Sequence, residues 1–333
     1  MVKKSSSVAV VIPTIGREYV AKTLPLVIKN ISRSVQKVGT KPFFIIEDST
    51  PGGLKSEVLD LIRETGEKVT IVPAQGLGAN EAWERGFKLA TRRGAVAMLG
   101  CCDDFVSESR HFDKLVKPLL EGRAELTTGA WKEYGRNILS FPKPQYLSEI
   151  WVSRLMNYAN PRFDSRAFDS NPFLKNPNSF QAFTGIVGLT PKALKQISHF
   201  VDKTFEKSSP EIKRKLSGWG YDPMRILVAL SLGLRTANVG FASRRFEHKT
   251  PATKELSRFV ASRLSQYTDA VDVLREFIVR TNQSHKLKQF DKMAAIIHER
   301  ISRGQYSTAN LINRKGKRRE IYNRMKAIAL RKK

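Results

Sequence analysis

Two adjacent carboxylates follow an apolar stretch in the first third of the chain. Residues 96–105 read VAMLGCCDDF, so the apolar run ends abruptly at Asp103 and Asp104. A short apolar run of this kind predicts a buried strand, and in an open α/β sheet ligands bind beyond the carboxyl ends of the strands. Carboxylate oxygens placed there suit Mg²⁺ or Mn²⁺, which can in turn hold a phosphate. The structural alternative is an Asp-Asp turn or a helix N-cap.

Two further segments carry residues that could take part in chemistry. In GWGYDP, at 218–223, Asp222 either caps the apolar helix expected over 224–232 or acts as a general base. The loop GLGAN, at 76–80, precedes an expected helix whose first backbone N–H groups can face a phosphate or a sugar. Its length does not match a dinucleotide-binding fingerprint, and the sequence has no phosphate-binding loop of the GxxxxGK[ST] type.

The elements that must position these residues alternate along the chain. Apolar runs predict buried strands, and apolar residues three and four apart predict helices. The expected strands cover residues 7–14, 43–46, 69–72, 96–102, 183–190 and 237–241, and the expected helices cover 18–35, 54–65, 81–91, 111–120 and 224–232. Strands that alternate with helices predict an α/β fold with a mostly parallel central sheet flanked by helices.

Two segments fall outside this alternation. Residues 134–180 are rich in Pro, Asn and aromatic residues, which indicates either an irregular surface segment or loops that bind an acceptor. From about residue 251 the pattern is helical and basic, and residues 314–333 form the densest cationic block of the chain. This block is expected to clamp a phosphate backbone, with a solvated helical end as the alternative.

The net charge indicates a polyanionic partner. The chain of 333 residues has 58 Lys and Arg against 31 Asp and Glu, a formal net charge of +27. Such a charge attracts polyanions and releases their counterions, so nucleic acid is the first candidate partner and an anionic membrane surface the second. A merely basic surface is the third interpretation. The sequence shows no zinc finger, RNA-recognition signature or basic leucine zipper.

The two cysteines and the hydropathy pattern bear on the compartment. Cys101 and Cys102 are adjacent, and neighbouring cysteines rarely have the geometry for a mutual disulfide. Reduced thiols favour a cytoplasmic protein, in the host cytoplasm if the chain is of viral origin. We find no signal-peptide pattern and no segment long and apolar enough to span a bilayer.

Six short motifs, taken in order, resemble those of GT-A glycosyltransferases, close to the family 2 type. They are VIPT at 11–14, EDS at 47–49, GLGAN at 76–80 with Gly86, CDD at 102–104, FTGIVG at 183–188 and GYD at 220–222. The resemblance rests on their order and spacing over residues 7–250. It implies a GT-A-like, Rossmann-like catalytic domain over 1–250, followed by a basic helical region over 251–333. With the charge, it suggests a phage-type DNA base glycosyltransferase.

The resemblance implies a nucleotide-sugar site at the strand ends. Pro13 and Thr14 would line the nucleotide pocket, and Asp48 would hold the base or ribose of a nucleoside diphosphate sugar, a UDP-sugar being favoured. The other members of this set, which would lie near the nucleotide and the sugar, are Gly78, Asn80, Cys102 and Asp103.

The resemblance also implies a metal ion and a general base. Asp103 matches the metal-coordinating Asp that ends the family's D-x-D motif. Asp104 beside it and His248 further along would complete the ligands of Mn²⁺ or Mg²⁺. Asp222 matches the base that takes a proton from the acceptor hydroxyl in an inverting transfer.

Two positions depart from the family pattern. Cys101 stands where the first Asp of D-x-D is expected, and Tyr221 stands where the family has a Glu before the catalytic Asp. A thiol suits a hard cation poorly. We therefore expect either that Asp103 and Asp104 share the metal or that the metal binds more weakly than usual.

Three functions remain open because a fold does not determine the acceptor. The first is glycosyl transfer to DNA, for example to a hydroxymethylated pyrimidine that the enzyme flips out of the base stack. The second is transfer to surface polysaccharide or lipid, with the basic tail on an anionic membrane. The third is non-catalytic nucleic-acid binding on the same scaffold. The charge favours transfer to DNA. The sequence does not determine the oligomeric state.

Overall fold

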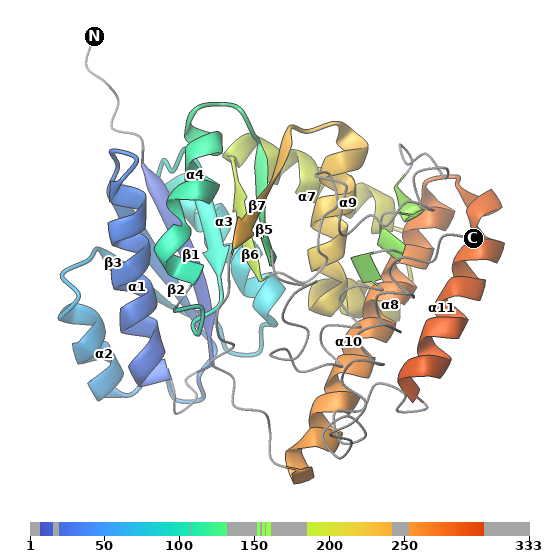
Figure 1. Ribbon diagram of the computed structural model, residues 1–333, viewed down its shortest axis with the longest axis horizontal. Helices are drawn as coiled ribbons and strands as arrows, with labels where there is room; N and C mark the ends of the chain where they lie inside the picture. Colours follow the sequence, from blue (N-terminus) through green and yellow to red (C-terminus); the bar gives the residue numbers. More distant parts are fainter. Residues whose placement is uncertain are drawn as a thin grey trace, which may run out of the picture. The chain divides into compact units, whose positions relative to one another are not determined.

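The computed structural model describes most of the chain, in two compact units (Figure 1). The described residues are 7–15, 20–106, 108–131, 152–153, 155–156, 158–160, 185–241 and 253–302. Unit 1 holds those within 1–131, 184–199 and 232–244, and unit 2 those within 132–183, 200–231 and 245–333. Each unit is therefore made of three segments that alternate along the chain, whereas the sequence predicted two continuous domains that meet at residue 250. The predicted catalytic domain over 1–250 and basic region over 251–333 stay predictions.

Unit 1 is built on a seven-stranded sheet in the order β3-β2-β1-β4-β6-β5-β7. Strands β1 to β4 pair in parallel, β7 pairs in parallel with β5, and β6 runs antiparallel to its neighbours β4 and β5. The strands are β1 (Val8–Thr14), β2 (Pro42–Asp48), β3 (Val69–Pro73), β4 (Ala97–Cys101), β5 (Leu126–Trp131), β6 (Ile186–Leu189) and β7 (Thr236–Phe241). This mostly parallel sheet confirms the predicted α/β fold class.

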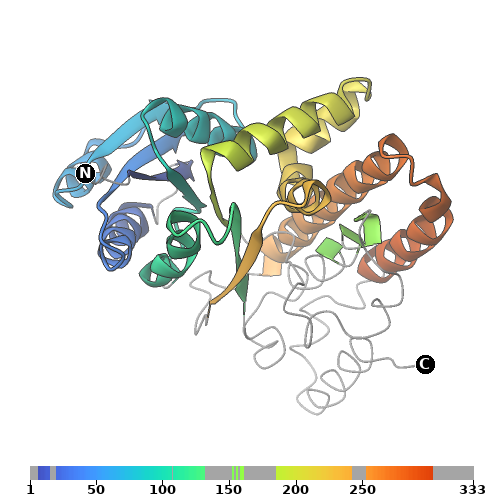
Figure 2. The same ribbon diagram turned by 90° about the horizontal axis from the view of Figure 1, so that it is seen from above.

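Helices cover both faces of this sheet, as its central strands require. Residues 8–12 of β1 are fully buried and apolar without alternation, which is the pattern of a strand covered on both sides. One face carries α1 (Val20–Gln36), the short helix η1 (Glu108–His111) and α4 (Asp113–Leu120), with α2 (Ser56–Arg63) beside α1. The other face carries α3 (Ala79–Arg92) and the first part of α7 (Pro191–Phe205) (Figure 2).

Strand β5 was not predicted from the sequence. Its residues LTTGAW lack a continuous apolar run, yet Thr127 and Thr128 are both buried. The Thr127 hydroxyl donates to the Leu115 carbonyl at 3.2 Å, which satisfies the buried polar group. The antiparallel direction of β6 was also missed, because period and composition do not determine strand direction.

The α3 helix lies unusually close to β1 at Gly86. A Cβ atom at this position would overlap Cγ1 of Val11. We predict that Gly86→Ala lowers the free energy of unfolding by about 1–3 kcal/mol, because overpacking outweighs the higher helix propensity of Ala. Thermal unfolding measures the change, and Arg92→Ala on the exposed side of the same helix is the control. An unchanged melting temperature for Gly86→Ala would contradict this packing.

Unit 2 is helical in its described part. It contains α8 (Pro210–Lys215), the π-helical turn η3 (Leu216–Gly220), α9 (Tyr221–Leu232), α10 (Thr253–Arg280), η4 (Ser284–Lys286) and α11 (Leu287–Ser302). The buried Tyr267 and Phe290 pack between α10 and α11, and the Tyr267 hydroxyl donates to the Ala294 carbonyl at 3.1 Å. The helical prediction beyond residue 251 is thus confirmed over 253–302. No described helix of either unit is long and apolar enough to cross a membrane.

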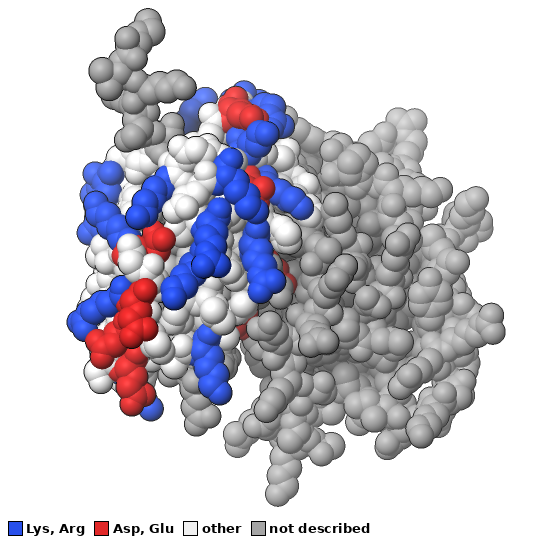
Figure 3. Space-filling view, turned by 60° about the vertical axis from the view of Figure 1, so that its left-hand side comes forward, with Lys and Arg blue, Asp and Glu red and all other residues white. Residues whose placement is uncertain are grey.

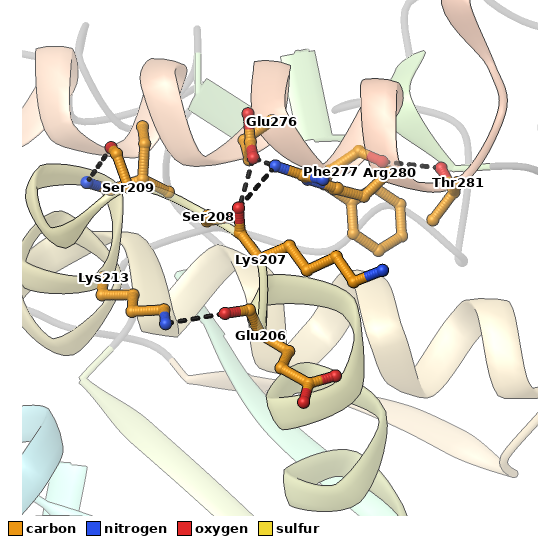
Figure 4. A network of polar contacts seen from close by, with 10 residues as sticks. Glu206, Lys207, Ser208, Ser209, Lys213, Glu276, Phe277, Arg280 and Thr281 are labelled. Atoms are coloured by element: carbon orange, nitrogen blue, oxygen red, sulfur yellow. Dashed lines mark hydrogen bonds and ion pairs between the residues drawn. The ribbon is translucent and has the colours of Figure 1, made fainter.

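A polar network fastens the connection between α7 and α8 to α10 (Figure 4). The Ser208 hydroxyl donates to Oε1 of Glu276 at 2.7 Å, and Nε of Arg280 donates to the same oxygen at 2.8 Å. Arg280 also donates to the Lys207 carbonyl at 2.9 Å. The start of α8, and with it the chain that leads to α9, is therefore held by side chains of α10.

Candidate functional site

The carboxyl ends of β1 and β4 bring together two residues that are far apart in the sequence. Thr14 ends β1, and Asp103 follows β4 by two residues, on the neighbouring strand. The Thr14 hydroxyl donates to Oδ2 of Asp103 at 2.6 Å, and both residues are buried. A carboxylate is thus held in a fixed orientation at the edge of the sheet where open α/β folds bind ligands.

Asp48 ends β2 at the same edge and orders the loop that follows it. Its two carboxylate oxygens accept hydrogen bonds from the backbone N–H groups of Thr50 and Leu54, both at 2.9 Å. These contacts make Asp48 the organiser of the turn between β2 and α2. The contact with a base or ribose that the resemblance implied for Asp48 stays a prediction.

The loop before α3 is tied to the end of β2. The Ala74 N–H donates to the Asp48 carbonyl at 2.6 Å. The helix starts at Ala79, two residues earlier than expected, with Gly78 as N-cap. The Gly78 N–H donates to Oε2 of Glu81 at 3.1 Å, as in a capping box. That the loop faces a phosphate or a sugar stays a prediction.

Asn80 and Pro13 complete the predicted set at this edge. Asn80 is buried in the first turn of α3, and Pro13 is the half-buried penultimate residue of β1. Cys102 lies between β4 and Asp103, and its Sγ is 4.0 Å from the Gly185 carbonyl at the start of β6. The edge thus gathers the predicted residues from three neighbouring strands, and their contacts with a nucleotide sugar stay predictions.

The thiol of Cys101 lies among carboxylates. Burial raises the pKa of this thiol well above its ordinary value, and the nearby charges of Asp103, Asp104 and Glu108 raise it further. Cys101 therefore stays protonated at neutral pH and is a poor metal ligand. Cys101 and Cys102 form no disulfide with each other.

The metal ligands predicted from the sequence are only partly described. Asp103 is buried and Asp104 half-buried directly beside it, whereas His248 lies outside the described residues. Among the residues that the structure describes, no three His, Cys, Asp or Glu side chains are grouped in a way that could hold a metal ion. That Asp103 and Asp104 hold a metal ion therefore stays a prediction.

An ion pair between a buried carboxylate and a partly exposed arginine, behind this edge, was missed in the sequence. Glu47, fully buried next to Asp48 on β2, accepts a hydrogen bond from Nε of Arg85 at 2.9 Å, and Arg85 also donates to the Pro73 carbonyl. Burial raises the pKa of Glu47, while the hydrogen bond and the charge of Arg85 oppose that rise. The pair fastens α3 to the ends of β2 and β3. Glu47 directly follows the apolar run 43–46, and the local sequence does not contain its partner.

Asp222 belongs to unit 2. The expected turn begins as a kink at Gly218, whose backbone is non-helical, and the chain then continues from η3 directly into α9, with Asp222 in the first turn of α9. Its Oδ1 is 3.4 Å from Nη1 of the buried Arg225. The guanidinium carbon of Arg225 lies 4.8 Å from the centre of the Tyr221 ring. Burial raises the pKa of Asp222 to about 6, and the charge of Arg225 opposes that rise.

The start of α9 is itself held against α10. Nζ of Lys215, at the end of α8, lies 2.6 Å from Oδ2 of Asp272 and 2.7 Å from Oε1 of Glu211. A Cβ atom on Gly220 would lie 2.6 Å from Cγ2 of Val273, so only glycine allows this close packing. Asp222 therefore occupies a fixed position within unit 2, with a pKa near neutrality.

Comparisons with known proteins were made by sequence and by structure. No family model and no curated protein matches the chain. Mannosyl-3-phosphoglycerate synthase from Rubrobacter xylanophilus is 15% identical, covers 84% of this chain and 75% of its own, and has a TM-score of 0.48. The mannosyltransferase PcManGT from Pyrobaculum calidifontis, in complex with GDP-Man and Mn²⁺, is 12% identical. The match covers 97% of this chain and 85% of PcManGT, with a TM-score of 0.45.

A third solved structure is a CMP:2-keto-3-deoxy-manno-octonic acid synthetase complexed with CTP. It is 13% identical, covers 78% of this chain and 99% of its own, and has a TM-score of 0.41. Because these three TM-scores lie below 0.5, none of the similarities identifies the function of this chain.

Proposed function

We propose that the protein is a metal-dependent glycosyltransferase that moves a sugar from a nucleoside diphosphate sugar, with a UDP-sugar favoured, to an acceptor hydroxyl. The observation that carries this proposal is the contact between Thr14 and Asp103 at the carboxyl edge of the sheet. A buried carboxylate fixed by a hydroxyl at this edge suits a bound cation and diphosphate better than it suits a core. The sequence motifs supply the sugar-transfer assignment.

The donor set fits a divalent cation of the Mg²⁺ or Mn²⁺ type. Such ions bind through one or two carboxylates and complete their coordination with substrate phosphates and water. Asp103 and Asp104 would supply those carboxylates, with His248 as a further ligand, while Thr14 orients the Asp103 carboxylate. When bound, the metal would supply Lewis-acid stabilisation of the diphosphate leaving group.

Asp222 is proposed as the general base of an inverting transfer. It would take the proton of the acceptor hydroxyl while the oxygen attacks the anomeric carbon and the C–O bond to the diphosphate breaks. A pKa of about 6 suits this role, because the carboxylate is mostly ionised at neutral pH and is still basic enough to accept a proton. Arg225 would hold the carboxylate in place between turnovers.

The acceptor is proposed to be a hydroxymethylated pyrimidine base in DNA, modified in the cytoplasm. The net charge of +27 supports a polyanionic acceptor, since counterion release favours binding to DNA. Transfer to polysaccharide or lipid, and DNA binding without catalysis, are the alternatives that the test below separates.

The test offers radiolabelled UDP- and GDP-sugars with Mn²⁺ to the protein, with either hydroxymethylated or unmodified duplex DNA as acceptor. We expect label on the hydroxymethylated DNA alone, and a loss of at least about a hundredfold in rate when EDTA removes the metal. Donor hydrolysis without label on DNA would reject the DNA acceptor. Neither binding nor hydrolysis of any donor would reject the enzyme itself.

A further inference from the structure

The outer surface of α1 carries a row of cations. Lys22, Lys29, Arg33 and Lys37 follow one another at intervals of seven, four and four residues, which places them on one side of the helix and its C-terminal turn. Three of them are exposed and Lys29 is half-buried. The helix itself contains no acidic residue. At 1.5 Å per residue the row is about 22 Å long.

A second row of cations runs along η1 and α4. Arg110, Lys114 and Lys117 are exposed and are spaced four and three residues apart, so they too share one side. Together with the α1 row they make up what we call the cationic face of unit 1. Figure 3, turned so that the side with α1 and α2 comes forward, shows Lys and Arg side chains over much of the described surface.

The two rows are locked side by side. The Ser34 hydroxyl of α1 donates to Oδ1 of Asp113 at 2.7 Å and accepts the Asp113 N–H at 2.9 Å. Asn30 donates to the Val106 carbonyl at 2.9 Å, just before η1. These contacts join α1 to the start of α4, so the rows form one rigid surface.

The environment of His111 shows that the rows meet in space. Burial lowers the pKa of His111, and Lys114 on α4 lowers it further, as do Lys37 after α1 and Arg110. Asp113 opposes this effect. The cations of both rows are therefore close enough to act on one imidazole.

Most of these charges have no carboxylate partner. Within the described residues, six of the seven cations form no ion pair, and Lys117 lies 3.9 Å from Glu121, which is also paired with Arg123. Asp113, the acidic residue between the rows, is already bonded to Ser34. The six unpaired cations on this surface repel one another, and a bound polyanion relieves that repulsion.

We propose that the cationic face of unit 1 binds the phosphate backbone of DNA. Laid along the duplex axis, the α1 row spans the rise of about six base pairs at about 3.4 Å each. The inference deepens the proposed function, on which it rests for its role, because it states where the DNA acceptor is held. Such contacts fix the position of the protein on DNA and read no sequence.

An anionic membrane fits this face less well. Peripheral attachment to lipid combines basic residues with apolar side chains that enter the interface. On α1, η1 and α4 the one large apolar side chain that is exposed among the described residues is Leu26. Two straight rows of cations without an apolar set between them match a linear polyphosphate.

The test compares two full-length variants that lose the same charge from opposite faces of the sheet. One is K29Q/R33Q/K114Q on the cationic face. The control is K88Q/R92Q/K195Q on α3 and α7. Binding of a fluorescent DNA duplex is measured between about 50 and 200 mM salt, and binding to phosphatidylserine vesicles is measured in parallel.

We expect the cationic-face variant to lose at least about tenfold in DNA affinity, with the slope of log K against log salt reduced by about 2 to 3. The control should bind nearly as the unchanged protein does. Equal losses in the two variants would overturn the proposal, as would no loss in the first or a loss confined to vesicles. The binding assay contains no sugar donor, so its result does not depend on whether the protein transfers sugar.

Discussion

Replacing Asp103 by Asn is expected to lower the rate of sugar transfer at least about a thousandfold, a change of about 4 kcal/mol in transition-state stabilisation. Asn has nearly the same shape and keeps an oxygen that can accept the Thr14 hydroxyl. It removes the negative charge that the proposed cation needs. Turnover is measured against Mn²⁺ concentration, and the variant should show no activation within the range that saturates the unchanged protein.

Thr14 provides the matched comparison for this result. Thr14→Val keeps the shape of the side chain but removes the hydroxyl that orients Asp103, whereas Thr14→Ser keeps the hydroxyl. We expect the Val variant to need more Mn²⁺ for half-maximal turnover and the Ser variant to restore the original requirement. If Asp103→Asn kept more than about a tenth of the activity, the proposed metal site would be wrong.

Replacing Asp222 by Asn is expected to lower the rate about 10²- to 10⁴-fold, the usual contribution of a general base. In the unchanged protein kcat/KM should rise with pH through about 6, because the carboxyl must lose its proton to act as base. The variant should lose this acidic limb. The measurement is the pH profile of kcat/KM for transfer to the acceptor.

Stability should respond to the same group with a definite sign. The folded-state pKa of Asp222, about 6, lies above the ordinary value of 3.8. The favourable contribution of the neutral carboxyl is therefore complete below pH 3.8 and is lost as the pH rises through about 6. Asn does not ionise, so the melting temperature of Asp222→Asn should fall less over this range than that of the unchanged protein.

Asp269 on α10 is the control for charge loss in unit 2. Burial raises its pKa too, and Lys215 opposes the rise, but the residue takes no part in the proposed transfer. Asp269→Asn should keep both the turnover and the acidic limb of the pH profile. An Asp222→Asn variant that matched this control in both measurements would exclude Asp222 as the base.

Apolar runs gave the positions of β1, β2, β3 and β4 to within a few residues. For the buried strands β1, β2 and β4 the reason is that strands covered on both faces need nearly continuous apolar sequence. The same rule missed β5, where buried Thr127 and Thr128 satisfy their polar groups through distant partners. It also gave no sign that Glu47 would be fully buried against Arg85. A buried polar residue depends on a partner elsewhere in the chain, and local sequence does not contain that partner.

The sequence by itself determined the alternation of β1 to β4 with the helices between them, the carboxylates that follow β4, and the excess of positive charge. Each of these is a local or a summed property of the chain. Only the tertiary structure decided that Thr14 meets Asp103 across 89 residues, that β6 runs antiparallel, and that α1 and α4 join their cations into one face. The physical reason is that strand pairing and burial depend on contacts between segments far apart in sequence, where packing rather than periodicity determines the partner.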